Sequence, residues 1–533
     1  MERIVVVGSG ASGVHFALSC LLKGRAVTML DVGFTGEPHP RPEDSLVGLK
    51  RNLADPVNYF LGPRYGSLAL PGRHGEYYAF PPAKDHVFRP AGALQFQTNG
   101  FSPLSSFAAG GLAEVWTGGC YPFDDQDLRQ FPFGWDQLET YYTRVAERIG
   151  ISGTEDDLKS VLPLHGGLQP PLDADEHSAE LLAAYARRRQ HLNQRLGCLM
   201  GRARVAVLSR DLDGRKACGY SGRCLWGCPR QSLYTPAITL SRCRAFPNFQ
   251  YLDGLYVDHF RISGSGKVRS VVVRRADGVM EEIAADALVL AAGTLGSAKI
   301  FLESLHRDSG QILSLSGLMD NRQILMPFVN LRMLGRKWNP DTYQYHQVAM
   351  AVRVRESGEM IHGLITTLKT ALIHPLVQTL PFDLAGSLTA FRSVHAALGM
   401  ININFPDYRR QENYVTLDTS STPHRLAIHY QPDVSEPARL KQTIAAFRKV
   451  LWKLGCFAPR PMIHVRPMGA SVHYAGTLPM SESGGAGSCT KHGASRDVDG
   501  LFFADGTTFP SLPAKNLTFT LMANATRIAE EAF

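Results

Sequence analysis

The apolar residues of this chain occur in short continuous runs that predict strands and in spaced patterns that predict helices. Residues 4–7 are an apolar, mostly β-branched run, typical of a parallel strand buried on both faces. A glycine-rich turn, a helical stretch and a second apolar run ending at Asp31 follow. Residues 285–304 again predict a buried strand and a helix, and residues 500–533 predict a strand, a proline-containing loop and a closing helix. This order indicates an α/β protein.

The middle of the chain predicts a sheet of another kind with helices beside it. Residues 400–418 and 424–433 have the pattern of sheet strands, and residues 435–455 that of the helix that follows them. Residues 134–150 predict an amphipathic helix whose apolar face is interpreted as core, with Leu138, Tyr141, Tyr142, Val145 and Ile149 on that face.

The most apolar region, residues 363–391, is interrupted by charged residues and prolines, including Lys369 and Pro375. It falls short of the roughly 20 uninterrupted apolar residues that a membrane-spanning helix needs. The sequence therefore predicts no transmembrane segment. Two interpretations of this region stay open: a packed helix, or a surface patch that docks peripherally on a membrane or a partner.

Length and charge narrow the class of protein. A chain of 533 residues with 20% charged and 44% hydrophobic residues predicts a soluble globular protein of two lobes. The net charge of +8 is dispersed, and the densest basic run, residues 187–189, lies in a helical stretch, so we expect no nucleic-acid partner. The N-terminus lacks the features of a signal peptide, and an odd number of cysteines favours a reducing compartment or a metal site. We expect a cytoplasmic protein.

The turn after the first predicted strand carries the glycine pattern of a dinucleotide-binding site. Gly8 permits a sharp turn, Gly10 lets a pyrophosphate approach the backbone, and Gly13 allows close contact between helix and strand. The helix N-terminus can bind the phosphates, and Asp31 can accept hydrogen bonds from ribose hydroxyls. The motif by itself does not separate FAD from NAD. The contacts predicted here are Gly8, Ser9, Gly10, Ala11, Ser12, Gly13 and Asp31.

The combination of this turn, the strand ending at Gly293, the motif HxxGT at residues 473–477 and the C-terminal strand, loop and helix resembles the glucose–methanol–choline (GMC) family of FAD-dependent oxidoreductases. The resemblance implies a Rossmann-like FAD-binding domain assembled from discontinuous segments and an α+β substrate-binding domain with an antiparallel sheet. The segments implied for the FAD-binding domain are 1–35, 90–120, 215–310 and 460–533, and those for the substrate-binding domain and cap are 36–89, 121–214 and 311–459.

The resemblance also implies the residues of the active site. His473 matches the catalytic base of the family and Asn516 its partner, whereas His492, in a polar, glycine-rich stretch, reads as a surface loop. Relatives that attach FAD covalently often use a histidine in the segment of residues 107–123; this chain has Glu114, Val115 and Trp116 there, so FAD is expected to be non-covalent. The further FAD contacts implied are Gly111, Trp116, Thr117, Val257, Ala292, Gly293, Asp505 and Gly506.

A cluster of three cysteines has two interpretations. Cys218, Cys224 and Cys228 follow the spacing C-x5-C-x3-C with a proline after the last, which is typical of iron–sulfur ligation and resembles the segment that carries a three-iron (3Fe–4S) cluster in bacterial sugar dehydrogenases. Alternatively, the thiols pack as small apolar groups.

The function implied is FAD-dependent oxidation of a CH–OH group of a carbohydrate-like alcohol (a sugar, glycoside or aminoglycoside-type compound), by hydride transfer to flavin N5 with His473 as base. The electron acceptor is open among oxygen, a quinone and a redox protein. Two alternatives remain: a redox-neutral flavin epimerase or isomerase of sugars, and a flavin subunit of an electron-transfer complex. A nicotinamide enzyme is disfavoured, because only one strong nucleotide motif is present.

Overall fold

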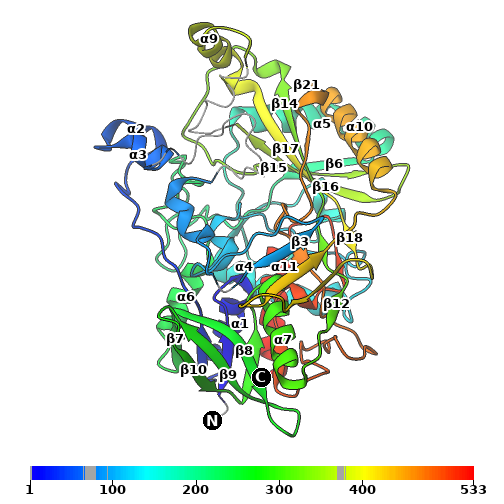
Figure 1. The fold of residues 1–533 in the computed structure, drawn as a ribbon. Coiled ribbons are helices and arrows are strands. Elements are labelled where there is room, and N and C mark those ends of the chain that lie inside the picture. Colours follow the sequence, from blue (N-terminus) through cyan, green and yellow to red (C-terminus); the bar gives the residue numbers. More distant parts are fainter. Residues whose placement is uncertain (1–2, 64, 66–79, 93, 369–376, 378–379) are drawn as a thin grey trace.

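The computed structural model describes residues 3–63, 65, 80–92, 94–368, 377 and 380–533. The described residues form an α/β fold with a parallel sheet near one end of the molecule and a larger antiparallel sheet near the other (Figure 1). Both chain termini lie at the end that holds the parallel sheet (Figure 1). The predicted fold class is confirmed.

The parallel sheet has five strands in the order β24-β11-β1-β2-β7. It is assembled from segments far apart in the sequence, as the resemblance implied. The strands are short, and most of them are rich in β-branched or aromatic residues, which suits burial between two layers. The strands are β1 (Ile4–Val7), β2 (Val27–Leu30), β7 (Phe249–Leu252), β11 (Ala287–Leu290) and β24 (Leu501–Phe503).

Alternate residues of β1 enter different cores, which explains why the whole run is apolar. Ile4 and Val6 join a cluster formed by α1 and α11, whereas Val5 and Val7 join the cluster on the opposite face. The helices on the first side are α1 (Ala11–Leu22), α11 (Thr518–Ala532) and α6 (Pro236–Arg244). Helix α4 (Trp135–Ile149) packs against α11, and its buried residues belong to the cluster of Val5 and Val7. The opposite face carries α7 (Thr294–Ser309) and a three-stranded antiparallel sheet of β8 (Leu255–Ile262), β9 (Val268–Arg275) and β10 (Met280–Ala284).

The antiparallel sheet has seven strands, in the order β21-β14-β17-β16-β15-β6 with β22 beside β14. One face is apolar and is covered by α5 (Glu176–Leu196) and α10 (Glu436–Lys453). The strands are β6 (Cys198–Arg202), β14 (Gln323–Asn330), β15 (Val348–Arg353), β16 (Met360–Thr367), β17 (Leu398–Asn404), β21 (Cys456–Phe457) and β22 (His464–Val465).

Short strands connect the two large sheets. A four-stranded sheet has the order β12-β19-β20-β3, and β13 pairs with β23 and β18 with β25. These strands are β3 (Phe96–Asn99), β12 (Ser314–Ser316), β13 (Met319–Asp320), β18 (Asp407–Tyr408), β19 (Tyr414–Asp418), β20 (Arg425–His429), β23 (Tyr474–Ala475) and β25 (Ser511–Leu512). The remaining elements include β4 (Ile151–Ser152), β5 (Leu168–Gln169), α2 (Leu46–Asn52), α3 (Pro56–Leu61), α9 (Leu384–Val394) and the 3-10 helices η2 (Gly111–Val115) and η7 (Gly506–Thr508).

Several predicted elements match and two differ. The helices predicted over 134–150 and 435–455 are α4 and α10. The strand region 400–418 does not belong to one sheet: it contributes β17, β18 and β19 to three different sheets. The predicted domain boundaries stay a prediction.

Residues 363–391 do not form one packed helix. Gly363–Thr367 belong to strand β16, and a helix begins only at Leu384. Much of the stretch between them, residues 369–376 and 378–379, lies outside the described residues. Phe382 and Leu384 are 60% and 71% exposed, and a docking role for this region stays a prediction. None of the helices in the described ranges has both the length and the apolarity to span a bilayer.

Candidate active site

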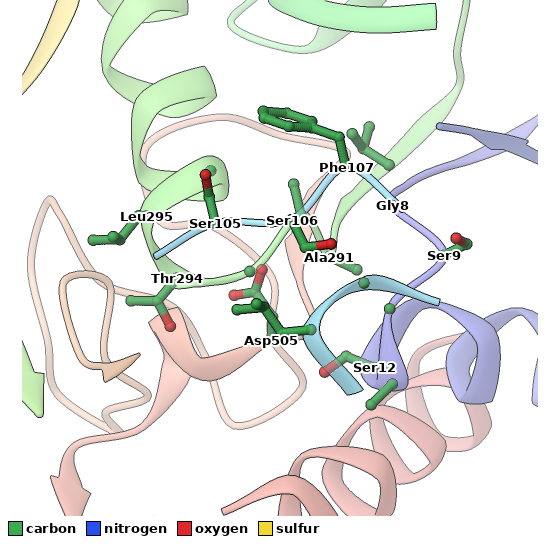
Figure 2. Close-up of a pocket in the computed structure, with 18 of the residues that line it drawn as sticks. Gly8, Ser9, Ser12, Ser105, Ser106, Phe107, Ala291, Thr294, Leu295 and Asp505 are labelled. Carbon is green, nitrogen blue, oxygen red and sulfur yellow. The ribbon is translucent and has the colours of Figure 1, made fainter. Parts of the chain in front are cut away.

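A cavity opens at the carboxyl ends of β1, β2 and β11, where ligands of parallel α/β sheets usually bind. Figure 2 shows residues from several distant segments turned toward it. Its lining includes Gly8, Ser9, Gly10, Ala11, Ser12, Asp31, Gly111, Val257, Ala292, Gly293, Asp505 and Gly506. The structure therefore brings together these predicted cofactor contacts, although they come from five separate parts of the sequence.

The glycine turn has the geometry that its sequence demands. Gly8 has φ +96°, and a Cβ there would lie 2.7 Å from the carbonyl oxygen of Ala291. A Cβ on Gly13 would lie 2.0 Å from the carbonyl oxygen of Gly8, so only glycine allows this helix to start against the turn. Gly10 instead faces open space, and a Cβ on Gly111 would lie 3.3 Å from the Cα of Gly10. The backbones at Gly10 and Gly111 thus leave a narrow space that their own side chains do not fill, which we call the cradle.

The first turn of α1 supplies donors to this cradle. Gly10 is its N-cap residue, and no side chain caps the helix there. The first N–H groups of a helix have no partner within the helix, and the helix dipole favours an anion at this end. The first turn contains no acidic residue that would compete for the site. The cradle and these donors fit the pyrophosphate of a dinucleotide.

Asp31 follows β2 and lines the cavity. Its carboxylate accepts hydrogen bonds from the Ser9 hydroxyl and, at 3.1 Å, from the Tyr251 hydroxyl. Burial raises the pKa of Asp31 to about 6, although these hydrogen bonds favour the ionised form. Ser9 also accepts a 2.9 Å hydrogen bond from the Gly110 amide, so the turn, the acidic residue and the second glycine segment are linked.

Asp505 lines the cavity, but its carboxylate already accepts hydrogen bonds from other residues of the protein. It accepts hydrogen bonds from Ser297 Oγ at 2.5 Å and from the amide and hydroxyl of Thr507 at 3.0 Å and 2.7 Å. Because Asp505 is 2% exposed, burial raises the pKa of this carboxyl. Asp505 thereby joins the N-terminal end of α7 to η7, and Gly293 (φ +76°) is the N-cap residue of α7.

Three of the predicted contacts, Gly13, Trp116 and Thr117, do not line this cavity. Trp116 lies on a second cavity, together with Glu114, and its Nε1 donates a 2.7 Å hydrogen bond to the Tyr234 carbonyl oxygen. Thr117 accepts a 3.1 Å hydrogen bond from the Tyr343 hydroxyl through its carbonyl oxygen. A contact of Trp116 and Thr117 with FAD stays a prediction.

His473 and Asn516 do not themselves line the cavity, but their neighbours do. Val472 and Tyr474 flank the histidine, Leu517 follows the asparagine, and all three line the same space. The Oδ1 atom of Asn516 is buried and has no hydrogen-bond partner within the described residues. An unpartnered buried acceptor is costly, which favours a ligand group beside it.

The backbone around His473 is unusual. Val472, a β-branched residue, has φ +65°, and Thr477 has φ +86°. Such conformations are rare outside glycine and concentrate at functional sites. Gly476 has φ +82°, and a Cβ there would lie 2.1 Å from the Gly317 carbonyl oxygen. The spacing of histidine, glycine and threonine in the sequence therefore reflects a tight backbone approach between β23 and the residues before β13.

The imidazole of His473 is largely enclosed, with only part of its surface exposed. Its Nδ1 lies 2.9 Å from Oδ1 of Asn321. Burial, with a smaller contribution from the positive charge of Arg466, lowers the pKa of His473 to about 4. The ring is therefore neutral at physiological pH, which a proton acceptor requires.

His492, the other histidine nearby in the sequence, has a different setting. Its ring lies 3.1 Å from a carboxylate oxygen of Glu531, and its side chain is 39% exposed. It is not among the residues that line the cavity.

The three cysteines are free thiols that pack beside an apolar cluster. Burial raises the pKa of Cys218 to about 11 and that of Cys224 well above its usual range, as expected of thiols packed among apolar groups. Within the described part of the chain, no group of three histidine, cysteine, aspartate or glutamate side chains is arranged to hold a metal ion. The iron–sulfur interpretation is not supported.

Other residues of the site were not found from the sequence. Ser105, Ser106 and Phe107 line the cavity just before the glycine-rich segment, and their proximity to that segment was the available signal. Asn321 contacts His473 from a region whose sequence, GLMDNRQIL, carries no recognisable motif. No sequence signal could have found it.

Comparisons with known proteins agree with this geometry. Residues 409–525 match the family model of the GMC oxidoreductases. A search of curated proteins found no match.

Three solved structures share the fold over essentially the whole chain. Pyridoxine 4-oxidase from Mesorbium loti is 16% identical, with a TM-score of 0.62, covering 100% of this chain and 99% of its own. A formate oxidase is 11% identical, with a TM-score of 0.59 and coverage of 99% and 98%. An FAD-dependent oxidoreductase from Chaetomium thermophilum, solved with a bound fragment, is 14% identical, with a TM-score of 0.60 and coverage of 99% and 98%.

The parallel sheet and the cavity at its carboxyl end are those expected of a dinucleotide-binding α/β protein. Residues 409–525 thus match the GMC oxidoreductases, and the whole chain shares its fold with two solved oxidases and an FAD-dependent oxidoreductase.

The cradle yields a direct prediction. Gly13→Ala places a methyl group against the Gly8 carbonyl oxygen, so the turn must move. We expect a loss of about 1–3 kcal/mol in the free energy of unfolding and a marked fall in bound FAD, measured by denaturant unfolding and by the ratio of flavin to protein absorbance. Gly264→Ala, where a Cβ meets open space, is the matched control. Native FAD content in Gly13→Ala would contradict the assignment of the cradle.

Proposed function

We propose that this protein oxidises the CH–OH group of a carbohydrate-like alcohol, with FAD as cofactor, His473 as the base and Asn516 as the residue that orients the substrate oxygen. The observation that carries the proposal is the neutral His473, whose flanking residues line the same cavity as the glycine turn. FAD, when bound, supplies an acceptor for the hydride of the alcohol carbon.

The residues present fit non-covalent FAD. Gly8, Gly10 and Gly111 leave room for the pyrophosphate, and Asp31 can bind ribose hydroxyls. Among the described residues, no histidine or cysteine lines the cavity, so it lacks the side chains that most readily bond to a flavin. This supports retention of the cofactor by contacts alone.

His473 and Asn516 have different roles toward the substrate hydroxyl. The neutral imidazole can take the hydroxyl proton at the ring nitrogen that Asn321 does not contact. The Asn516 amide cannot act as a base near neutral pH, but its unpartnered oxygen can accept a hydrogen bond and its nitrogen can donate one. The enclosed setting of both groups limits access of water to the reacting oxygen.

The substrate class is supported by the polar face of the seven-stranded sheet. Gln323, Asn404 and His362 are aligned across β14, β17 and β16, on the face opposite α5 and α10. Gln323 donates a 3.0 Å hydrogen bond to Asn404. The buried polar atoms without a partner in the described residues include Asn402 Oδ1, Asn404 Nδ2 and both ring nitrogens of His362. Such atoms suit a ligand with several hydroxyl groups.

The acceptor and the redox-neutral alternative are resolved by one measurement. Two similar structures are oxidases, so oxygen is the first acceptor to examine. Anaerobic mixing with a panel of sugars, glycosides and simple alcohols should bleach the flavin bands until oxygen, a quinone or a redox protein is added. An epimerase would return to oxidised flavin without an acceptor, and a subunit that depends on a protein partner would stay inactive with artificial acceptors.

Substitution of the two proposed catalytic residues tests their roles. We expect His473→Gln to lower the rate constant of flavin reduction by at least about 100-fold, with FAD still bound, because the proton acceptor is lost. Asn516→Ala should lower it less, by about 10- to 100-fold. Stopped-flow absorbance at the flavin band measures both, and His492→Gln serves as the matched control because that ring pairs with Glu531 outside the cavity. A native rate constant of flavin reduction in His473→Gln would contradict the proposal.

The pH dependence follows from the lowered pKa of His473. Since the ring becomes protonated only near pH 4, flavin reduction should be independent of pH above about pH 5 and fall by about tenfold per unit below about pH 4. An unperturbed histidine would instead place this limb near pH 6.5. The same shift makes the unfolded state bind the extra proton first, so stability falls as pH decreases from about 6.5 toward 4. Rate and unfolding measurements across this range check both signs.

A further inference from the structure

We infer that Asn321 is a positioning residue that holds His473 in the tautomer with the proton on Nδ1, leaving the Nε2 lone pair for the substrate. The inference rests on the proposed role of His473 as the base. Asn321 is 1% exposed and does not line the cofactor cavity, so it acts through the histidine.

The orientation of the Asn321 amide is determined by its other contacts. Its Nδ2 donates to the carbonyl oxygen of Phe405 at 2.7 Å and to that of Pro513 at 3.0 Å. Carbonyl oxygens only accept hydrogen bonds, so the nitrogen of the amide must face them. A rotated amide would bring its oxygen against two acceptors. The atom that faces His473 Nδ1 at 2.9 Å is therefore the amide oxygen.

The proton on the ring follows from this orientation. Asn321 Oδ1 can only accept, so Nδ1 of His473 must carry a hydrogen to make this bond. A neutral imidazole has a single N–H, and Nε2 is then unprotonated. The Nε2 atom has no hydrogen-bond partner among the described residues. Asn321 thus prepares a base by holding the proton on the other side of the ring.

The residue before Asn321 holds the backbone that carries the histidine. Asp320 accepts a 2.6 Å hydrogen bond from the Gly469 amide and another from the Ser471 hydroxyl, and it pairs with Tyr474 across β13 and β23. Ser471 Oγ in turn accepts a 3.1 Å hydrogen bond from the amide of His473. Asp320 and Asn321 therefore constrain the backbone and the ring together.

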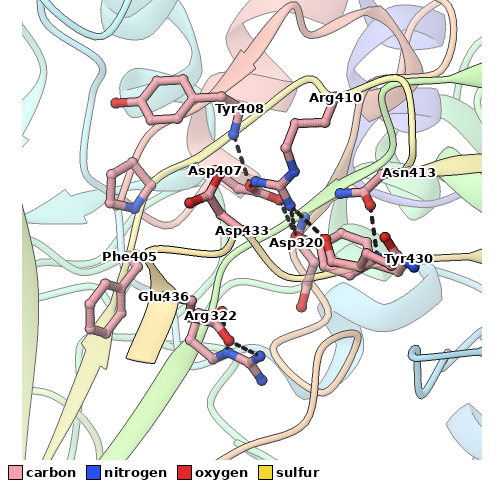
Figure 3. A network of polar contacts seen from close by, with 12 residues as sticks. Asp320, Arg322, Phe405, Asp407, Tyr408, Arg410, Asn413, Tyr430, Asp433 and Glu436 are labelled. Atoms are coloured by element: carbon pink, nitrogen blue, oxygen red, sulfur yellow. Dashed lines mark hydrogen bonds and ion pairs between the residues drawn. The ribbon is translucent and has the colours of Figure 1, made fainter. Parts of the chain in front are cut away.

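The backbone of Asp320 is itself hydrogen-bonded into a buried polar network. Its amide donates a 3.1 Å hydrogen bond to Asp407, which also accepts one from Tyr430 at 2.6 Å and one from Arg410 at 3.3 Å (Figure 3). A network with several mutual partners keeps its members in one arrangement. The position of Asn321, the next residue, is set by this rigid base.

Asn321 also connects His473 to the loop of its partner. Pro513, whose carbonyl oxygen receives one of the Asn321 bonds, lies three residues before Asn516. One amide thus bonds to the histidine, to the loop that carries Asn516 and, through Phe405, to the residue after β17. Loss of this amide affects the relative placement of the two proposed catalytic groups.

The charges near His473 define what else can alter its protonation. Arg466 disfavours the charged ring, and the Asp320 carboxyl lies beside the His473 amide and accepts no bond from the ring; the Asp320 amide is bonded to Asp407. Burial raises the pKa of Asp320 to about 7, and the Asp407 charge adds to the rise. Any new charge at position 321 would act at the shortest distance of all, because it would touch Nδ1 directly.

Nitrogen-15 NMR of the FAD-loaded protein tests the tautomer without any turnover. The protein is labelled at its 18 histidines, and the signals of His473 are assigned as those lost in His473→Gln. We expect a protonated Nδ1 and an unprotonated Nε2 near neutral pH, which differ strongly in chemical shift. A proton on Nε2 would overturn the inference, whether or not the enzyme is active.

Two substitutions test the consequence. Asn321→Asp keeps an acceptor and adds a negative charge, so the pKa of His473 seen in flavin reduction should rise by about one to two units. Asn321→Leu removes the acceptor, so the His473 tautomers should become mixed, with a fall in kcat of about 10- to 100-fold and a much smaller change in KM. Asn330→Leu, a buried amide at the far end of β14 that accepts from the Arg332 amide, is the matched control and should do neither.

The outcomes of these experiments distinguish failure of the positioning role of Asn321 from failure of the proposed function. If His473→Gln abolishes flavin reduction while both Asn321 variants keep the native rate and pH profile, the positioning role is wrong and the proposed function stands. If His473→Gln remains active, the proposed function fails, although the NMR spectrum still reports the tautomer. If Asn321→Leu does not fold, Asn321→Asp and the spectrum of the native protein still decide the question.

Discussion

The pairing of β13 with β23, reinforced by Asp320 and Asn321, is the interaction on which the candidate site depends. The first strand leads directly into the seven-stranded sheet, and the second follows His473 and lines the cavity at the end of the parallel sheet. A buried polar contact of this kind is costly if half satisfied and strongly orienting if complete. Here the Asp320 carboxylate and the Asn321 amide each have at least two protein partners.

The cavity at the end of the parallel sheet depends on a different feature, namely glycines at positions where a side chain would not fit. Gly8, Gly13 and Gly111 allow backbones to approach each other more closely than any other residue would permit. The space left over, with the uncapped N-terminus of α1 and the Asp31 carboxyl at its rim, suits an anionic dinucleotide. Binding of the cofactor and formation of the sheet are therefore consequences of the same turn.

The two faces of the larger sheet differ in polarity. Its apolar face packs on α5 and α10, and its opposite face holds amides and an imidazole with atoms that find no hydrogen-bond partner among the described residues. Similar structures share the fold at 11–16% identity, and those described by substrate are a pyridoxine oxidase and a formate oxidase. The fold thus accommodates different substrates, and side chains on this face, such as Asn402, Asn404 and His362, are where a preference for hydroxyl-rich alcohols would arise.

Local patterns in the sequence were sufficient for the fold class, the glycine turn, Asp31 and the helices α4 and α10, because each depends on residues near one another in the chain. The interpretation of residues 363–391 as one packed helix was wrong, since an apolar run reads alike in a buried strand and a buried helix, and the strand β16 is decided by its neighbours β15 and β17. Only the tertiary structure placed Trp116 on a second cavity and packed the three cysteines, as partly buried free thiols, against an apolar cluster. Only it brought Asn321 to His473 across 152 residues, because a hydrogen bond between distant segments leaves no periodicity in either of them.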